Sequence, residues 1–328
     1  MAEAAALIRG WSMRNFVVAS LLSLSALATA ASAANCPIVD ATAAFWPLVQ
    51  RASTMTPVEQ AAAFRKTVLA QFPELYTGNV LGNGNVRALD ELSVVAMAAA
   101  RKNGLRGQAV ERDLVRKLPI FLAHFQKTFP DFRCDFPVYL MASLGSLDGA
   151  GRVVAGHPAL VIGVDTMAEF ETQGELPVVI AHELFHRYNF QAAGFSDDPG
   201  DRQAIWRTLW AEGLATYMSA QLNPQSSLAD VMISPDLAKR AAPMIKRLAR
   251  ALRDNDAPNP PLYAEYFEGG SKRASADGIP QRSGYYVGYR VVQLAAKHHS
   301  LYQLAHLKGP ALHDEINGYL KELAGGAR

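Results

Sequence analysis

The sequence has little excess charge of either sign. Its 328 residues carry 32 basic and 30 acidic side chains, so the formal net charge is only +2. This balance does not predict binding to nucleic acid or to an anionic membrane, and no stretch combines clustered basic residues with interleaved aromatic ones. Half of the residues are hydrophobic and 19% are charged, which is ordinary for a folded globular protein and argues against intrinsic disorder.

Cysteine is also scarce, since only Cys36 and Cys134 are present. In an oxidising compartment they can form one disulfide that ties the N-terminal segment to the middle of the chain. The alternative is a pair of buried free thiols. Neither cysteine lies near a catalytic pattern, and we expect the disulfide.

The N-terminus carries an apolar run with basic residues before it. Arg9 and Arg14 precede FVVASLLSLSALATA, and Ala31-Ser32-Ala33 follows. Basic residues, an apolar core and a small-x-small site are typical of a secretory signal peptide, so residues 1–33 are predicted to direct export to the periplasm or beyond. The alternative is an uncleaved membrane anchor. It is weaker because the run is rich in Ser and Ala and no charged stop-transfer cluster follows. We expect no stable membrane insertion after cleavage.

The rest of the chain divides into two regions of different texture. Residues 34–136 have apolar positions at helical spacing and predict a helical N-terminal lobe. Residues 137–328 begin with two short β-rich runs, PVYLMAS and HPALVIGVD, joined by a Gly-rich connection at 145–156. Helices follow to the end of the chain. The predicted fold class is α+β, mainly helical, with a small sheet packed over the first of these later helices.

Residues 178–190 read VVIAHELFHRYNF and place three titratable side chains in an apolar helix. Such burial costs free energy unless a partner satisfies the polar groups. A zinc ion does so, because His182 and His186 present imidazole nitrogens one helical turn apart, matching two corners of a tetrahedron. Glu183 leaves the helix at a different angle, so it can reach a metal-bound water as a general base without binding the metal. The alternative is a chance match of a short motif.

A catalytic zinc site needs a third protein ligand and one position open for water. The best candidate is Glu212, in WAEGLATY on the next predicted helix, because it interrupts a segment that is otherwise nearly free of charge. The alternative reading of Glu212 is a carboxylate on the surface of a helix. Asp197, Asp198 and Asp201 are nearer in sequence but lie in a predicted loop, and they rank behind Glu212.

The two motifs carry a family resemblance. The run His182–His186, read together with Glu212–Tyr217, resembles the gluzincins, which are the thermolysin-like clan of zinc metallopeptidases. With the later run Gly284–Tyr289, the chain is also similar to a bacterial family of uncharacterised predicted zinc-dependent proteases. The resemblance covers residues 137–295 and implies that 137–328 is a zincin-like catalytic region.

The resemblance implies a role for each matching residue of the motifs. His182, His186 and Glu212 would bind Zn2+. Glu183 would take a proton from the zinc-bound water and pass it to the leaving amine, so that a peptide bond is hydrolysed. This assignment describes an exported zinc metallopeptidase.

Tyrosines near residue 285 and the strand before the zinc helix complete the expected site. Tyr285 would donate a hydrogen bond to the oxyanion of the transition state. Tyr286 and Tyr289 are alternatives for this role, and aromatic packing is the alternative reading of all three. The substrate would be a peptide or an unfolded protein segment, laid by β-augmentation on HPALVIGVD as an edge strand.

Departures from the family pattern bear on the function. Thermolysin-type enzymes have an aspartate four residues after the ligand glutamate, where this chain has Thr216, and the Gly-x-Met-Glu-Asn motif of aminopeptidases is absent. Exopeptidase activity is therefore not supported. The alternatives to a peptidase are a non-peptidase zinc hydrolase and a non-catalytic exported zinc-binding protein on the same scaffold. Three ligands plus a base argue against the latter, since structural zinc normally has four protein ligands. Six further histidines have no spacing typical of ligands: His124, His157, His298, His299, His306 and His313.

Overall fold

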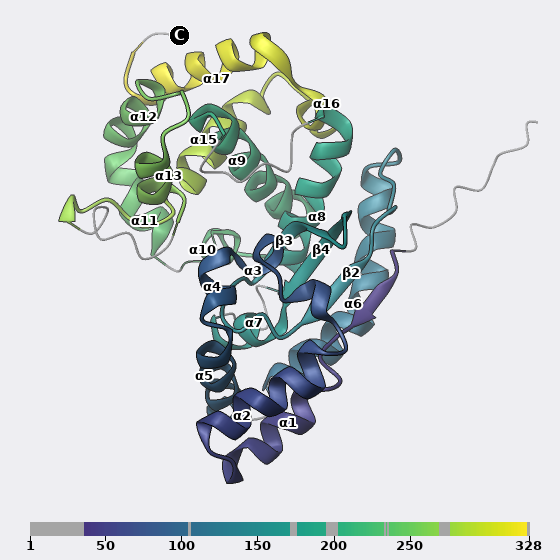
Figure 1. Ribbon diagram of the computed structural model, residues 1–328. Helices are drawn as coiled ribbons and strands as arrows, with labels where there is room; N and C mark the ends of the chain where they lie inside the picture. Colours follow the sequence, from purple (N-terminus) through teal and green to yellow (C-terminus); the bar gives the residue numbers. More distant parts are fainter. Residues whose placement is uncertain are drawn as a thin grey trace, which may run out of the picture. The chain divides into compact units, whose positions relative to one another are not determined.

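The structure is a computed structural model that describes residues 36–103, 106–170, 176–194, 203–232, 234, 236–268 and 276–326. The predicted signal peptide, residues 1–33, lies outside the described residues. Helices make up most of the described chain, and four short strands form one mixed sheet (Figure 1). The predicted α+β, mainly helical fold class is confirmed.

The sheet has the strand order β1-β2-β4-β3. Its strands are β1 (Ile38–Asp40), β2 (Val138–Met141), β3 (Gly149–Val154) and β4 (His157–Gly163). β1, β2 and β4 run parallel, whereas β3 pairs with β4 in the antiparallel direction. Most residues of β2 and β4 are buried, as expected for parallel strands that are covered on both faces. HPALVIGVD therefore supplies an interior strand, and the prediction that it is an edge strand is wrong.

The edge strand next to β4 is β3, which lies in the segment that was predicted to be a Gly-rich connection. Glycine is unfavourable in most strands, but it is found where a backbone passes close to another group. A Cβ on Gly149 would lie only 2.7 Å from Cγ of Glu183 in helix α8 (Leu176–Ala193). Ala155 and Gly156 then turn the chain with φ of 50° and 83°, as a two-residue hairpin requires. The glycine of β3 therefore lets the strand lie directly on α8, which carries the two predicted histidine ligands.

The region before β2 is helical, as the spacing of its apolar residues predicted. α2 begins with a capping box, in which the Thr56 side chain accepts from the Glu59 backbone and the Glu59 carboxylate accepts from the Thr56 backbone. The short strand β1 precedes these helices and joins the sheet through β2, which the helical pattern did not predict. The helices are α1 (Phe45–Arg51), α2 (Pro57–Phe64), α3 (Gly78–Leu81), α4 (Asn83–Arg87), α5 (Leu89–Lys102) and α6 (Arg106–Thr128).

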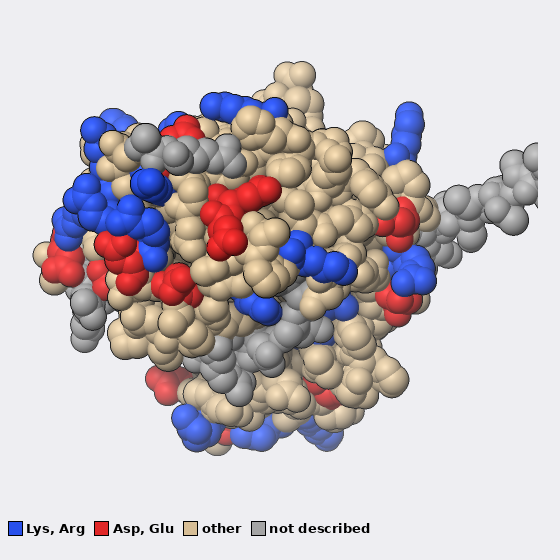
Figure 2. Space-filling view, turned by 90° about the horizontal axis from the view of Figure 1, so that it is seen from above, with Lys and Arg blue, Asp and Glu red and all other residues tan. Residues whose placement is uncertain are grey.

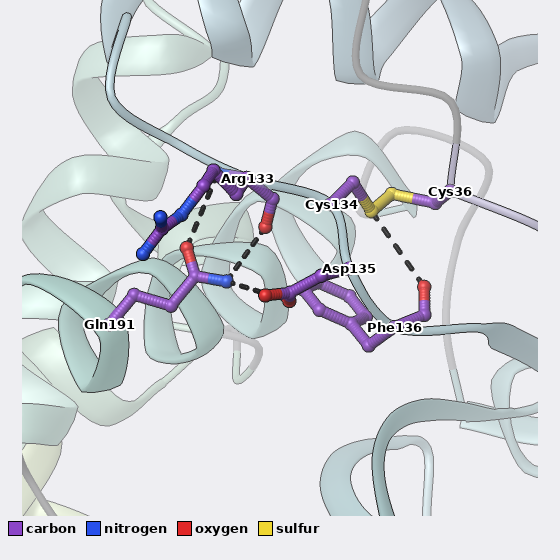
Figure 3. Close-up of a disulfide and its surroundings, with 6 residues drawn as sticks. All are labelled: Cys36, Arg133, Cys134, Asp135, Phe136 and Gln191. Carbon is purple, nitrogen blue, oxygen red and sulfur yellow. Dashed lines mark hydrogen bonds between the residues drawn. A yellow bond between two sulfur atoms is a disulfide. The ribbon is translucent and has the colours of Figure 1, made fainter.

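Cys36 and Cys134 form a disulfide, so the expected bridge is confirmed (Figure 3). The bond joins the segment before β1 to the segment before β2, across a sequence separation of 98 residues. Beside it, the Gln191 side chain of α8 donates to the carbonyl oxygen of Arg133 at 2.7 Å and to the Asp135 carboxylate at 3.1 Å (Figure 3). The segment that carries Cys134 is therefore held both to the N-terminal segment and to α8.

The C-terminal part of the chain packs helices around α8 and α9 (Ile205–Leu222). Two glycines lie where α9 crosses α15 (Ser283–Ala295): a Cβ on Gly213 would lie 2.2 Å from the carbonyl carbon of Gly288, so the two backbones are in contact. The helices are α7 (Val164–Phe170), α8, α9 (Ile205–Leu222), α10 (Leu228–Val231), α11 (Leu237–Ala241), α12 (Ile245–Arg253), α13 (Pro260–Tyr266), α15 (Ser283–Ala295), α16 (Leu301–His306) and α17 (Gly309–Leu323).

The surface of the described chain reflects its nearly balanced charge. Figure 2 shows one face on which a group of basic side chains at one end lies against acidic ones, with a broad uncharged area beside them. Within the described residues, no helix is both long enough and apolar enough to cross a membrane.

Candidate metal centre

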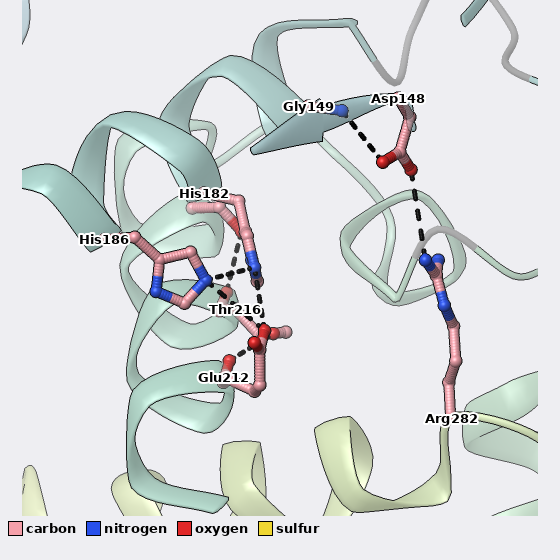
Figure 4. Close-up of polar contacts among 8 residues, drawn as sticks. Asp148, Gly149, His182, His186, Glu212, Thr216 and Arg282 are labelled. Carbon is pink, nitrogen blue, oxygen red and sulfur yellow. Dashed lines mark hydrogen bonds and ion pairs between the residues drawn. The ribbon is translucent and has the colours of Figure 1, made fainter. Parts of the chain in front are cut away.

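Helices α8 and α9 bring the three predicted metal ligands together. Most of the 18 residues of α8 are buried, and His182 and His186 lie one turn apart on it, with their Nε2 atoms 3.0 Å apart. α9 packs against α8 and contributes Glu212, whose Oε2 lies 3.1 Å from His182 Nε2 and 3.3 Å from His186 Nε2 (Figure 4). Two adjacent turns of one helix and a carboxylate from its neighbour therefore converge on one point.

The three side chains fit a divalent metal ion. One ligand atom from each lies within 4.8 Å of the other two, and tetrahedral zinc with bonds of about 2.0–2.2 Å places neighbouring ligand atoms roughly 3.4 Å apart. Two imidazole nitrogens 3.0 Å apart cannot both act as acceptors, so in the absence of a cation one of them must carry a proton. The set supplies three donors, as catalytic zinc sites do, and it is the one such group found among the described residues.

The charges of these residues reinforce one another. Burial by itself would raise the pKa of Glu212, but the charge of His186 and hydrogen bonds from both histidines hold that pKa well below its usual range. Burial likewise opposes the charge of His186, yet the Glu212 carboxylate outweighs it and raises the pKa of His186. Glu212 is therefore ionised at neutral pH. Its side chain is 21% exposed, so a carboxylate oxygen is available to a cation in a partly dehydrated setting.

Glu183 lies on the face of α8 that is turned toward β3. Its Cγ sits beneath Gly149, where only the lack of a Cβ leaves room for it. Burial raises the pKa of the Glu183 carboxyl, although the charges of His182 and His186 oppose the rise. A carboxylate with a raised pKa is suited to accept a proton near neutral pH.

Among the three tyrosines considered for the oxyanion, Tyr285 is the one whose ring lies beside a predicted zinc ligand, His182. Its ring stacks on that of His182, with centroids 6.0 Å apart and an interplanar angle of 23°. Tyr286 is buried in the core, and the ring of Tyr289 packs against Tyr217 at 5.8 Å. Burial raises the pKa of Tyr285 well above its ordinary value, so its phenol stays protonated and can donate a hydrogen bond.

Two charged residues beside the site were missed by sequence reasoning. Asp148 precedes β3, and Arg282 precedes α15 with a φ of 59°. The Arg282 guanidinium lies 4.0 Å from the Asp148 carboxylate (Figure 4). Its Cζ lies 5.5 Å from the ring centroid of Tyr285. Neither residue belongs to a motif. The only available signal was that Arg282 stands three residues before Tyr285.

The other residues considered from the sequence have different surroundings. Thr216 uses its hydroxyl within α9, where it donates to the carbonyl oxygen of Glu212 at 2.7 Å. Asp197, Asp198 and Asp201 lie outside the described residues. Three of the remaining histidines pair with carboxylates away from the site: His299 with Glu315 (3.1 Å), His306 with Asp131 (3.0 Å) and His313 with Asp256 (2.9 Å).

A helical α+β scaffold with a His-His-Glu centre defines a class of metal-binding proteins. Within that class, residues 151–311 match the family model described as Predicted Zn-dependent protease (DUF2268). The match confirms the predicted resemblance to a family of predicted zinc-dependent proteases, and it agrees with Zn2+ as the cofactor and a protease as the enzyme class. Searches of curated proteins and of solved structures gave no match. The matched segment contains α8, α9 and α15, which carry the candidate metal centre and Tyr285.

Proposed function

We propose that the protein is an exported zinc metallopeptidase of gluzincin type, which hydrolyses peptide bonds with Glu183 as the general base. The observation that carries the proposal is the convergence of His182, His186 and Glu212, with Glu183 on the adjoining face of the same helix. A three-donor centre beside a half-buried acid is the arrangement that metal-assisted hydrolysis requires.

His182, His186 and Glu212 would hold the zinc ion. When bound, zinc acidifies a water molecule to a pKa of about 7 and polarises the scissile carbonyl. Glu183 takes a proton from the attacking water and delivers it to the leaving amine. Burial raises the pKa of Glu183, which strengthens the carboxylate as the base in the first of these two transfers.

Tyr285 supplies a hydrogen-bond donor beside His182. Its stacking on His182 fixes the ring, and its raised pKa keeps the hydroxyl protonated. A fixed donor stabilises the oxyanion that develops on the scissile carbonyl, without any cost of reorientation at that moment.

The edge strand β3 is the element on which a peptide would lie. It pairs with β4 along one side only, and its first residue, Gly149, lies against Glu183. An extended peptide paired with such an edge is held by backbone hydrogen bonds and passes over the catalytic helix. This role belongs to β3, in place of HPALVIGVD.

Export is supported by the signal-like sequence of residues 1–33 and by the pairing of the two cysteines. Disulfides form and persist in oxidising compartments such as the periplasm and the extracellular space. The bond between Cys36 and Cys134 is therefore consistent with a protein that works outside the cytoplasm.

The function is tested by separating zinc binding from hydrolysis. Glu183→Gln should retain zinc and lose peptide cleavage, because it keeps the shape of the side chain but cannot accept the proton. His186→Ala should lose both, and His124→Ala, on the exposed side of α6, is the matched histidine control. Metal content and cleavage of a mixed peptide library, with and without a chelator, are the measurements. Zinc binding without any peptide cleavage by the wild type would overturn the peptidase and favour a non-peptidase zinc hydrolase.

A further inference from the structure

Arg282 is held beside the candidate active site in a rare backbone conformation. Its φ of 59° lies in the left-handed region, which is unfavourable for a residue other than glycine. Such a conformation persists only where the surrounding structure enforces it, and here it directs the side chain toward Asp148 (Figure 4). The Arg282 side chain is 35% exposed, so it is accessible to a solute.

The guanidinium of Arg282 has unused hydrogen-bonding capacity. The Asp148 carboxylate is 4.0 Å away, beyond hydrogen-bond distance, and none of the described residues accepts a hydrogen bond from Arg282. Asp148 itself accepts from the backbone N–H of Gly149 at 2.8 Å. A guanidinium presents five donors in a planar fork, which matches the two oxygens of a carboxylate. Within the described part of the chain, hydrogen-bond donors of the Arg282 guanidinium are therefore open to an anion.

A second arginine, Arg152 of β3, flanks the same acids but is already engaged. It donates to two backbone carbonyls at 3.1 and 2.9 Å. Burial lowers the pKa of Arg152, although the carboxylates of Glu183 and Asp148 favour its charge. With zinc bound, the divalent ion and the two arginines outweigh the carboxylates of Asp148, Glu183 and Glu212. The loaded site is therefore net positive and attracts anions.

We propose that Arg282 is the carboxylate receptor of this active site, and that the enzyme prefers peptides with a carboxylate within about two residues of the scissile bond. The inference rests on the proposed peptidase function. Arg282 Cζ lies 5.5 Å from the ring of Tyr285, which would stand at the scissile carbonyl. An extended peptide advances about 3.3–3.6 Å per residue, so one or two residues span that separation. The carboxylate comes either from an Asp or Glu side chain or from the free C-terminus.

A peptide series tests the preference and distinguishes the two sources. Each position on either side of the cleaved bond carries Glu or Gln in turn, and each peptide is made with a C-terminal acid and with an amide. For the zinc-loaded wild type, kcat/KM should be about 10- to 100-fold higher for the carboxylate than for its neutral partner at one position. The Glu/Gln pairs report a side chain, and the acid/amide pairs report the C-terminus. Equal rates throughout would overturn the proposal.

Variants assign the preference to one side chain. Arg282→Gln should bring the ratio of the two rates to about 1, whereas Arg282→Lys, which keeps the charge but not the fork, should retain part of it. Arg290→Gln, on the same helix α15, is the matched control and should keep the wild-type ratio. If Arg282→Gln lowers kcat/KM equally for all peptides, the ratio of carboxylate to neutral peptide stays at the wild-type value. Arg282 then acts only through Tyr285, and its role as carboxylate receptor is overturned. Thermal unfolding of each variant verifies that it is folded.

Binding without turnover separates this inference from the proposed function. In a zinc-loaded Glu183→Gln background, calorimetry should give a dissociation constant about 10-fold or more lower for the preferred carboxylate peptide than for its neutral partner. Adding Arg282→Gln should remove the difference. If the carboxylate peptide binds preferentially but the wild type cleaves no peptide, Arg282 is supported as the carboxylate receptor and the peptidase function is overturned. If the wild type cleaves all peptides without preference, the peptidase function is supported and the receptor role of Arg282 is overturned. No measurable binding of any peptide would overturn the receptor.

Discussion

Replacing Gly213 by alanine should push apart the helices that carry Glu212 and Tyr285. The added Cβ would meet the carbonyl carbon of Gly288 at 2.2 Å and its Cα and oxygen at 2.5 Å, whereas ordinary contact begins at 3.4 Å. Backbone atoms cannot rotate out of the way, so α9 and α15 must separate by about 1 Å. Overpacking of this kind costs about 1–3 kcal/mol. At about 2–4 °C per kcal/mol for a large domain, Tm should fall by roughly 2–12 °C.

Thermal unfolding with excess zinc and with a chelator measures this loss. The Gly213→Ala protein should be less stable in both conditions and should bind zinc more weakly, because Glu212 shifts relative to the two histidines on α8. Gly84→Ala in α4 is the matched control, since nothing lies within 4 Å of a Cβ there, and its Tm should be unchanged or slightly higher. A Gly213→Ala protein with wild-type Tm and zinc affinity would refute the reasoning that backbone contact between α9 and α15 positions Glu212.

Three further predictions concern single features of the structure. Tyr285→Phe should keep zinc and lower kcat/KM about 100-fold, and an unchanged rate would mean that Tyr285 is not the oxyanion donor. Replacing Cys36 and Cys134 by serine should lower the free energy of unfolding by about 2–4 kcal/mol, since the bond closes a long loop; denaturant midpoints equal to the wild type would contradict this. Because the pKa of His186 is raised above 6.5 in the metal-free protein, zinc affinity should fall as the pH drops through that raised value. Titrations from mildly alkaline to mildly acidic pH check this, and a flat profile would count against it.

The metal ligands were accessible to sequence reasoning to different degrees. His182 and His186 share a helical turn, so their proximity follows from local periodicity alone. Glu212 lies on another helix, and only its isolation as a charge in an apolar segment pointed to it. Asp148 and Arg282 gave no such signal, because their approach depends on two irregular connections meeting in space. A positive φ at an arginine cannot be read from the sequence, since only glycine and asparagine favour it.

The sheet shows a similar division between local and tertiary information. The apolar run that begins at His157 correctly predicted a strand, but its hydrophobicity is that of an interior strand, and edge strands are rarely so apolar. β3 was not predicted because Gly149 and Gly151 lower the strand propensity of the segment. Glycine is needed at these positions because side chains of α8 lie directly against them. β1 spans only three residues, which is too short for any pattern to emerge. Tertiary contacts decided all three cases.

The close fit of Gly149 over Glu183 has a consequence for how new specificities can arise on this scaffold. The candidate metal ligands come from α8 and α9, most of whose residues are buried, so most replacements there would be destabilising. The flanks that a ligand would touch come from two connections far apart in the sequence, one leading into β3 and the other into α15. Insertions, deletions or charge substitutions in either connection would leave the sequence of α8 unchanged. To change the substrate specificity, the connections that end at residues 148 and 282 should therefore be replaced, and α8 (Leu176–Ala193) should be kept.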